Sequence, residues 1–450
     1  MPVAPFFAPP RARDYWLADA RLVEATLAGP PPRGADEEGL ARADLRIVDG
    51  KIAAIAPRGT APESAASLGG GMILPGFVDI HTHLDKGHIW PRQPNPDGSW
   101  DGAIAAVIAD KYAAWSIDDV ERRFDFALRA AYAHGTVAVR THIESNPERA
   151  DMTWGLFRRM REAWRGRIEL QASSILPSPV FTRAYAPKLA DLIAAAGGHL
   201  GLVLRMGRGP TPIGGEEIEQ AIDLALALAA ERGLDLDLHV DETDDPNSTA
   251  LYRLARAAVK RRFKGKIVAG HCCSLATQSD AVVAKTLAAA ADAGIAIVSL
   301  PMCNLYLMDR KAGRTPRWRG VTLVHEAKAA GLPVAFASDN TRDPFYGYGD
   351  LDMLEVFREA SRIAHLDRPF GDWPRAFAAV PAELMRLADR GRIKVGAPAD
   401  LVLFKGRSFD ELLSRPQADR VVLRAGRAID ATPPDYAELD DLFRKKARGR

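Results

Sequence analysis

The chain has 450 residues, of which 47% are hydrophobic and 26% are charged, as in a globular protein with a sizeable core. Its formal net charge of +2 excludes the strongly basic surface of a nucleic-acid-binding protein, so we expect no nucleic-acid partner. Three cysteines are too few for a disulfide framework, and no long uncharged apolar run occurs. We therefore expect no membrane association and a cytoplasmic location.

The first predicted element, over residues 43–57, alternates apolar and polar residues around Asp49-Gly50, which is typical of a β-hairpin. Short apolar strands then alternate with Ala-rich helical stretches. The predicted strands cover residues 72–80, 136–143, 168–176, 200–206, 234–240, 266–271, 295–300 and 333–339. Strand character returns in residues 391–406 and 420–430.

Eight successive strand–helix units predict an α/β fold, a (β/α)₈ TIM barrel whose active site lies at the C-terminal ends of the strands. The β segments on either side predict a small β-sandwich domain built from both chain termini. We expect residues 1–74 and 389–450 to form this β domain, and residues 75–388 to form the barrel.

Histidines and an aspartate fall at the ends of several predicted strands. His81 and His83 end the first barrel strand and share one face, because alternate residues of a strand point to the same side. His239 ends the fifth strand, His271 the sixth and Asp339 the eighth. These ends converge on one mouth of a barrel. Three imidazoles and a carboxylate suit Zn²⁺ or Fe²⁺ and leave a position open for water, so the sequence predicts a metal site.

Four motifs, PGFVDIHTHLDK, HVDETDD, GHCC and ASDNTRDPFYGYGDLDML, together resemble the amidohydrolase superfamily, and within it the cytosine deaminase-like group. The similarity covers nearly the whole chain. It implies a metal-dependent hydrolase that acts on carbon–nitrogen bonds other than peptide bonds. The implied reaction is hydrolytic deamination, in which the exocyclic amine or alkylamine of a small N-heterocycle, such as a pyrimidine or an s-triazine, is replaced by oxygen.

The resemblance also implies residue roles. It assigns one divalent metal ion, Zn²⁺ or Fe²⁺, to His81, His83, His239 and Asp339. Members with two metals usually carry a carboxylated lysine on the fourth strand, and this chain has none there. A metal-bound hydroxide would attack the ring, with Glu242 as the proton shuttle, His271 holding the hydroxide and Asp339 accepting its proton. For His142, on the second strand, a packing role and a site role both stay open.

Candidate substrate contacts lie near the same strand ends. Cytosine deaminase itself has an aspartate in place of Asn340 and a glutamine at the end of the third strand, where this chain has Ser174. The pairing of Lys86 with Asn340 is more similar to the relative that hydrolyses N-isopropylammelide, so we do not expect cytosine as the main substrate. Phe345 and Tyr346 could stack on a flat heterocycle or only pack the loop. Lys86 could meet a ring carbonyl or pair with an acid at the barrel rim.

Two other functions compete with deamination. A cyclic-amide hydrolase on the same barrel would usually have two metals and the lysine on the fourth strand. A non-catalytic scaffold relative would have lost its ligands, but all the expected ligands and Glu242 are present. We expect a small heterocyclic substrate as the binding partner and assembly into a homo-oligomer.

Overall fold

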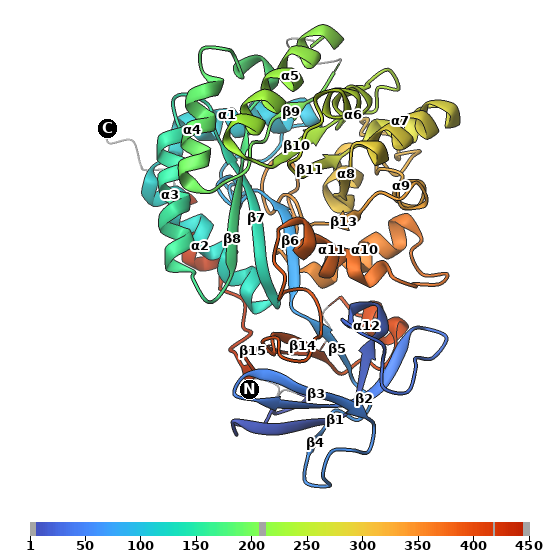
Figure 1. Ribbon diagram of the computed structural model, residues 1–450. Coiled ribbons are helices and arrows are strands. Elements are labelled where there is room, and N and C mark those ends of the chain that lie inside the picture. The colour runs from blue at the N-terminus through green and yellow to red at the C-terminus, as the bar shows by residue number, and fades with distance from the viewer. Residues whose placement is uncertain (1–5, 207–212, 417–418, 444–450) are drawn as a thin grey trace. The chain divides into compact units, whose positions relative to one another are not determined.

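The computed structural model describes residues 6–206, 213–416 and 419–443 (Figure 1). Contacts divide the chain into two compact units. The first comprises Met1–Ile80, Arg129–Ala138 and Asp352–Pro433; the second comprises His81–Leu128, Val139–Leu351 and Pro434–Arg450. The predicted domain bounds, 1–74 with 389–450 and 75–388, stay a prediction. The contacts group the segment from Pro434 onward with most of the barrel strands.

Strands from both ends of the chain form one sheet in the first unit (Figure 1). Its order is β16-β15-β14-β5-β1-β2-β3, and β4 pairs with β1. These strands are β1 (Asp14–Val23), β2 (Leu40–Val48), β3 (Lys51–Pro57), β4 (Ala66–Ser67), β5 (Met72–Pro75), β14 (Leu401–Phe404), β15 (Arg420–Arg424) and β16 (Arg427–Ala428). The predicted hairpin is confirmed, because β2 and β3 pair antiparallel across Asp49 and Gly50, both with positive φ.

The two ends of the chain share one apolar core in this unit. Leu17 and Leu45 from the N-terminal strands are fully buried in the same cluster as Leu401 and Leu423 from the C-terminal strands. Burying these side chains stabilises the fold by about 25 cal/mol per Å² of apolar surface removed from water, and both chain ends contribute to that surface. The prediction that strands from both chain termini build one small β domain is therefore confirmed, and these strands form the single sheet described above.

Eight parallel strands close into a barrel. They are β6 (Phe77–Thr82), β7 (Thr136–Glu144), β8 (Glu169–Ile175), β9 (Val203–Leu204), β10 (Leu236–Val240), β11 (Ile267–His271), β12 (Ile295–Ser299) and β13 (Val334–Phe336). Strands β9 to β13 form one sheet, and β6 to β8 form another. Parallel bridges Pro177↔Val203 and Thr82↔Asp339 join the two sheets at both edges. The predicted TIM barrel is confirmed.

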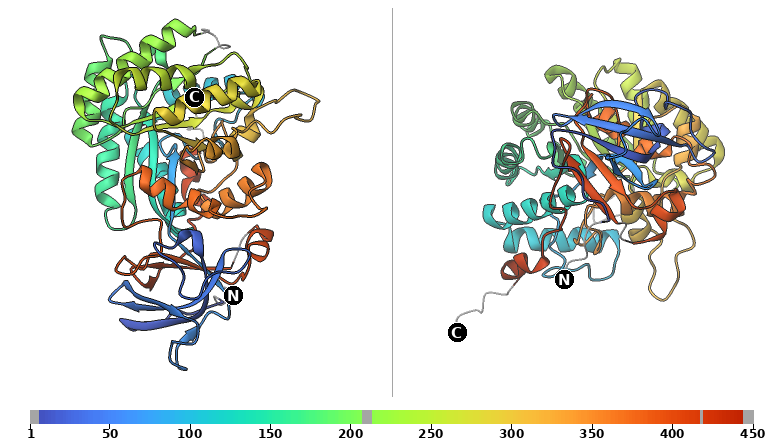
Figure 2. Two further views of the ribbon diagram at one scale, coloured as in Figure 1. Left: turned by 45° about the vertical axis from the view of Figure 1, so that its right-hand side comes forward. Right: turned by 90° about the horizontal axis from the view of Figure 1, so that it is seen from below.

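Helices α3 to α7 lie along the outside of the parallel strands of the second unit (Figure 2). Their Ala- and Leu-rich sequences favour helix, and α4 and α5 end at Gly197 and Gly233, both in the left-handed conformation. The helices are α1 (Trp100–Ala114), α2 (Ile117–Ala133), α3 (Ala150–Ala163), α4 (Ala186–Ala196), α5 (Gly215–Arg232), α6 (Ala250–Arg261), α7 (Asp280–Asp292), α8 (Pro301–Leu307), α9 (Val324–Ala329), α10 (Met353–Ala364), α11 (Ala379–Leu384), α12 (Phe409–Ser414) and α13 (Asp440–Phe443). Among the described residues, no helix is long and apolar enough to span a membrane.

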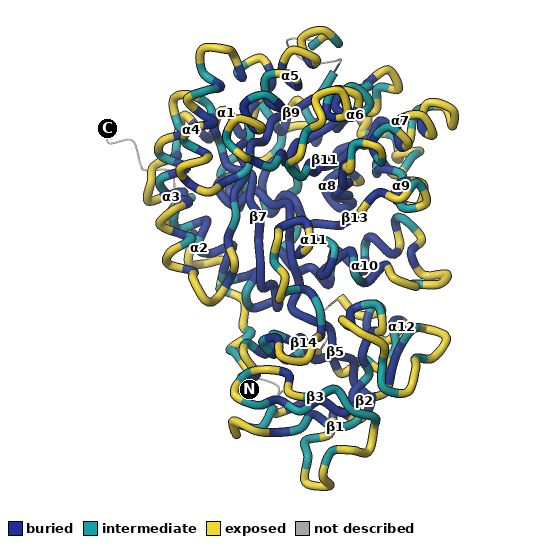
Figure 3. The backbone as a smooth tube through the Cα atoms, viewed as in Figure 1, coloured by how far each residue is buried: buried dark blue, intermediate teal, exposed yellow. Residues whose placement is uncertain are grey.

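The predicted single strand over residues 72–80 is wrong, because the chain leaves one sheet and enters the other at Gly76. Residues Met72–Pro75 belong to β5, whereas Phe77–Thr82 form β6. A Cβ atom on Gly76 would lie 2.3 Å from Val137 Cγ1, so only glycine fits this passage. Both strands are buried throughout, so hydrophobic periodicity gave no sign of the change (Figure 3).

Candidate metal centre and active site

The side-chain atoms predicted to bind a metal converge at the C-terminal ends of β6, β10 and β13. His239 Nε2 lies 3.1 Å from His81 Nε2 and 3.3 Å from His83 Nε2. Asp339 Oδ1 lies 3.2 Å from His83 Nε2 and 3.7 Å from His81 Nε2. Donors that bind one ion tetrahedrally at about 2.0–2.1 Å lie about 3.3–3.4 Å apart. The separations of His239 from His81 and His83, and of Asp339 from the same two histidines, are close to this value, as expected around a metal ion.

Burial prepares these groups to bind a metal. It lowers the pKa of His81 and His239 well below the usual value and that of His83 to about 4, so all three imidazoles are neutral. Burial alone would raise the pKa of Asp339, but His83, His271 and Lys86 lower it more, and the group is a carboxylate. Both Asp339 oxygens are buried without a hydrogen-bond partner among the described residues. A buried polar atom without a hydrogen-bond partner costs free energy, and a bound cation would remove that cost.

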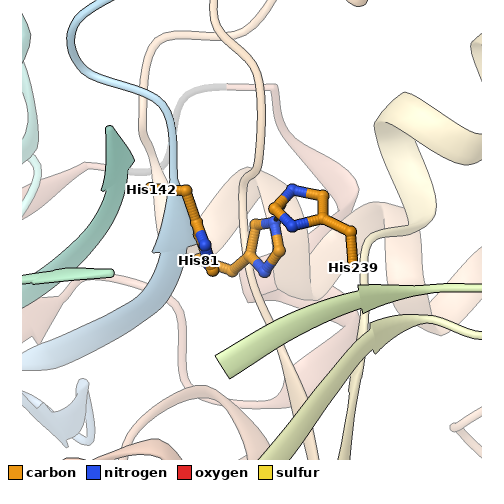
Figure 4. A group of neighbouring side chains, drawn as sticks. All are labelled: His81, His142 and His239. Carbon is orange, nitrogen blue, oxygen red and sulfur yellow. Dashed lines mark hydrogen bonds between the residues drawn. The ribbon is translucent and has the colours of Figure 1, made fainter. Parts of the chain in front are cut away.

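His81, His83, His239 and Asp339 are called the metal-type cluster below. His142 lies between this cluster and a buried ion pair. Its ring centroid is 4.0 Å from that of His81, and Figure 4 shows it with His81 and His239. These three side chains form a second group that could hold a metal ion. On its other side, His142 Nε2 is 3.6 Å from Asp237 Oδ1, and Asp237 pairs with Arg140 at 2.7 Å. The geometry thus accommodates both roles that the sequence left open.

Glu242 and His271 lie together beside the cluster, where two further residues contact them. Trp100 Nε1 donates a hydrogen bond to Glu242 Oε2 at 2.9 Å. Asn304 Nδ2 lies 3.0 Å from His271 Nδ1 and 3.4 Å from Glu242 Oε1. Neither Trp100 nor Asn304 was predicted from the sequence. For Asn304, its position just after the seventh barrel strand was a usable signal; Trp100, far along the segment after β6, had none.

The neighbouring Asp241 has a structural role. Its carboxylate accepts hydrogen bonds from the Ser248 hydroxyl and from the backbone N–H groups of Ala250 and Leu251, at 3.1 and 2.9 Å. These contacts satisfy free donors at the start of α6. Asp241 therefore fixes the helix that follows Glu242.

A cavity of about 150 Å³ adjoins the metal-type cluster. Three of the predicted substrate contacts, Lys86, Asn340 and Phe345, line it. Lys86 Nζ lies 4.2 Å from the centroid of the Phe345 ring, and Asn340 Nδ2 donates to Asp343 Oδ2 at 2.7 Å. His83, His239, Asp339, Glu242 and His271 also line the cavity.

The structure does not bring the other two predicted substrate contacts, Ser174 and Tyr346, to this cavity. The Ser174 hydroxyl donates to Gly201 O at 2.9 Å and accepts from Gly201 N at 2.8 Å, so its hydrogen-bond donor is used by the neighbouring strand segment. Tyr346 packs against the rings of Tyr306 and Tyr348, at centroid distances of 5.6 and 5.8 Å. Loop packing, the alternative kept open for the aromatic residues, therefore describes Tyr346.

One family model and two known proteins are similar to this chain. A model described as "Amidohydrolase family" matches residues 210–430. The chain is 50% identical over 441 residues to a pterin deaminase of Rhizobium rhizogenes, covering 97% of this chain and 99% of the relative. It is 23% identical over 371 residues to an N-isopropylammelide isopropyl amidohydrolase of Pseudomonas sp. strain ADP, covering 80% and 86%.

Solved structures show the same fold. A 5-methylcytosine deaminase from Klebsiella pneumoniae with bound 5-fluorocytosine has a TM-score of 0.77 at 24% identity, covering 92% of this chain and 97% of the other. N-isopropylammelide isopropylaminohydrolase from Burkholderia multivorans has a TM-score of 0.70 at 24% identity, covering 93% and 98%. The chain belongs to the amidohydrolase family and is a metal-dependent hydrolase of carbon–nitrogen bonds.

Proposed function

We propose that this chain deaminates a pterin by hydrolysis. Water adds to the ring carbon that carries the exocyclic amine, the carbon–nitrogen bond breaks, and the products are the ring carbonyl compound and ammonia. The observation that carries the proposal is the cluster of His81, His83, His239 and Asp339, of which the last three line one cavity together with Glu242. The relative that is 50% identical over almost the whole chain is a pterin deaminase, which favours a two-ring substrate.

We propose one divalent ion, Zn²⁺ or Fe²⁺, as the cofactor. Its ligands would be His81, His83, His239 and Asp339. When bound, such an ion lowers the pKa of its water from 15.7 to about 7 and supplies a nucleophile at neutral pH. The neutral imidazoles and the carboxylate are already in the protonation states that binding requires.

The remaining site residues would move protons and hold the ring. Glu242 protonates a ring nitrogen and then the leaving amine, and Asp339 takes the proton of the attacking water. His271, which lies 3.5 Å from Glu242 Oε1 through its Nδ1, orients that water with its other ring nitrogen. Lys86 and Asn340 read the polar edge of the ring, and Phe345 covers its face.

We also propose that the protein works in the cytoplasm as a homo-oligomer. All three cysteines are buried and free, which agrees with a reducing compartment. Light scattering of the purified protein at several concentrations measures the oligomeric state. A monomer at all concentrations would remove that part of the proposal.

Metal content and ammonia release together test the proposed reaction. We expect about one Zn or Fe per chain, and faster ammonia release from pterin than from cytosine or an aminated s-triazine. His83→Ala is the control and should lose both metal and turnover. Faster release from cytosine would contradict the substrate, and a fully loaded protein that releases no ammonia from any of these rings would contradict deamination.

A further inference from the structure

Helix α1 presents one stripe of side chains to the cavity. Trp100, Ile104, Val107, Ile108 and Lys111 all line it. Their spacing of three and four residues places them on one face of the helix. With a rise of 1.5 Å per residue, the stripe from Trp100 to Lys111 is about 16 Å long. Helix α1 thus forms a long wall of the cavity.

The two ends of this wall contact different groups. At one end, Trp100 donates to Glu242, the residue proposed to act on the reacting ring. At the other end, Lys111 Nζ forms an ion pair with Glu144 at the end of β7. With ring bonds of about 1.3–1.5 Å, a fused two-ring heterocycle spans about 5 Å between its outermost ring atoms. A bare pterin with its amine beside Glu242 therefore leaves most of the wall uncovered.

The Lys111 end of the wall has unused hydrogen-bonding capacity. The side chains of Lys111 and Glu144 are only 8% and 12% exposed. An ammonium offers three donors and a carboxylate about four acceptor positions, and the ion pair uses few of them. Asn146 also lines the cavity, and its buried Oδ1 has no hydrogen-bond partner among the described residues. A ligand that accepts from Lys111 and offers one donor to Glu144 and a second donor to Asn146 Oδ1 would satisfy all three side chains.

The charges at this end select among ligand groups. Asp85 lines the cavity beside the pair, and its Oδ2 accepts a hydrogen bond from Glu144 N at 2.7 Å. A carboxylate on the ligand would meet both Asp85 and Glu144, which is unfavourable in a site with little solvent. A hydroxyl can donate to Glu144 and accept from Lys111 without adding charge.

We infer that Lys111, Glu144 and Asn146 form a subsite for a hydroxyl-bearing substituent on the heterocycle. The preferred substrate is then a pterin that carries a hydroxyalkyl side chain. This inference rests on the proposed function and adds the part of the substrate that lies away from the reacting amine. A purely structural pair would only hold α1 against β7 and would not distinguish substrates.

Matched variants separate these two roles. Glu144→Gln keeps the shape but loses the charge, and Asn146→Ala removes the free carbonyl without touching the ion pair. Tyr112→Phe is the control, because the Tyr112 hydroxyl donates to Glu148 Oε2 at 2.9 Å and so ties the same helix to the same segment after β7. The lining residues of the cavity do not include Tyr112.

The test compares kcat and KM for pterin, a hydroxyalkyl pterin and a carboxylated pterin, together with the Kd of each deaminated product. The wild type should favour the hydroxyalkyl pterin over pterin at least tenfold in kcat/KM. Both site variants should lose about tenfold or more in kcat/KM for the hydroxyalkyl pterin, mainly through a higher KM. Both should also raise the Kd of the hydroxylated product by a similar factor. Pterin itself should change less than twofold, and Tyr112→Phe should change nothing.

Other results overturn the inference in distinguishable ways. Equal losses for pterin and hydroxyalkyl pterin would show a structural pair. A wild type that deaminates both equally, or prefers the carboxylated pterin, would refute the subsite and leave pterin deamination standing. A loaded wild type that deaminates no pterin would refute the proposed function and this inference with it.

Discussion

Replacing Trp100 with phenylalanine tests how the proton shuttle is held. The change removes one hydrogen bond of 2.9 Å to the Glu242 carboxylate and keeps an aromatic ring for the Arg205 guanidinium, which lies 4.0 Å from the ring centroid. A hydrogen bond to a charged group contributes about 1.5–3 kcal/mol, and about 1.4 kcal/mol corresponds to a tenfold change in rate. The second donor, Asn304, lies at 3.4 Å and compensates only partly. We expect kcat to fall about 10- to 50-fold.

Steady-state ammonia release measures kcat and KM of this variant separately, beside metal content, which should not change. KM should move less than threefold, because the lost contact orients a proton carrier and does not bind the ring. Trp115→Phe is the matched control, since Trp115 lines the same cavity but donates its Nε1–H to Asp110 Oδ2 at 2.9 Å. A Trp100→Phe enzyme with kcat within threefold of wild type, or no slower than the control, would show that the Trp100 hydrogen bond does not orient Glu242.

Three further variants test other parts of the molecule. Glu242→Gln should retain bound metal but lose at least 100-fold in kcat, and normal turnover with full metal would exclude the shuttle role. Asn340→Asp should raise the kcat/KM ratio of cytosine to pterin, and an unchanged ratio would show that this position does not read the ring. Burial raises the pKa of Asp352, but Arg420 lowers it more, to about 2. Because this folded-state pKa lies below the unfolded value, the carboxylate stabilises the protein above about pH 4, and about 2 kcal/mol is lost as pH falls to 2. The melting temperature of wild type should thus fall more between pH 4 and 2 than that of Asp352→Asn; equal falls would contradict the assignment.

The sequence sufficed for the features that depend on strand periodicity. His81 and His83 share a face because strand side chains alternate, and the ends of parallel barrel strands meet at one mouth. These two rules predicted that His239 and Asp339 would both lie near the first-strand histidines, and in the structure each forms a metal-type group that includes His81. The passage of the chain from β5 to β6 at Gly76 could not be predicted, because it depends on a close approach to Val137 that leaves no periodic signal in the sequence.

Contacts that depend on the path of a loop could not be read from the sequence. Trp100 reaches Glu242 only because the segment after β6 folds back as α1. Ser174 lies near the end of its strand, as a substrate contact would, but it does not line the cavity. A Cβ on Gly201 would lie 2.2 Å from Ser174 O, so the two segments approach closely and the Ser174 hydroxyl bonds to the Gly201 backbone. Such close approaches are set by tertiary packing.

The closure of the barrel coincides with the metal-type cluster. Strands β6 and β13, the first and last of the barrel, are joined in the described backbone by the single bridge Thr82↔Asp339, with Asp339 N–H donating to His81 O at 2.9 Å. A cation held by His81, His83 and Asp339 would fasten both sides of this weakly paired seam. Cofactor loading would then govern the mechanical integrity of the barrel as well as its chemistry. A chain that has lost the cation would open first at this seam. Amide hydrogen exchange would then be faster there, and proteases would cleave there first.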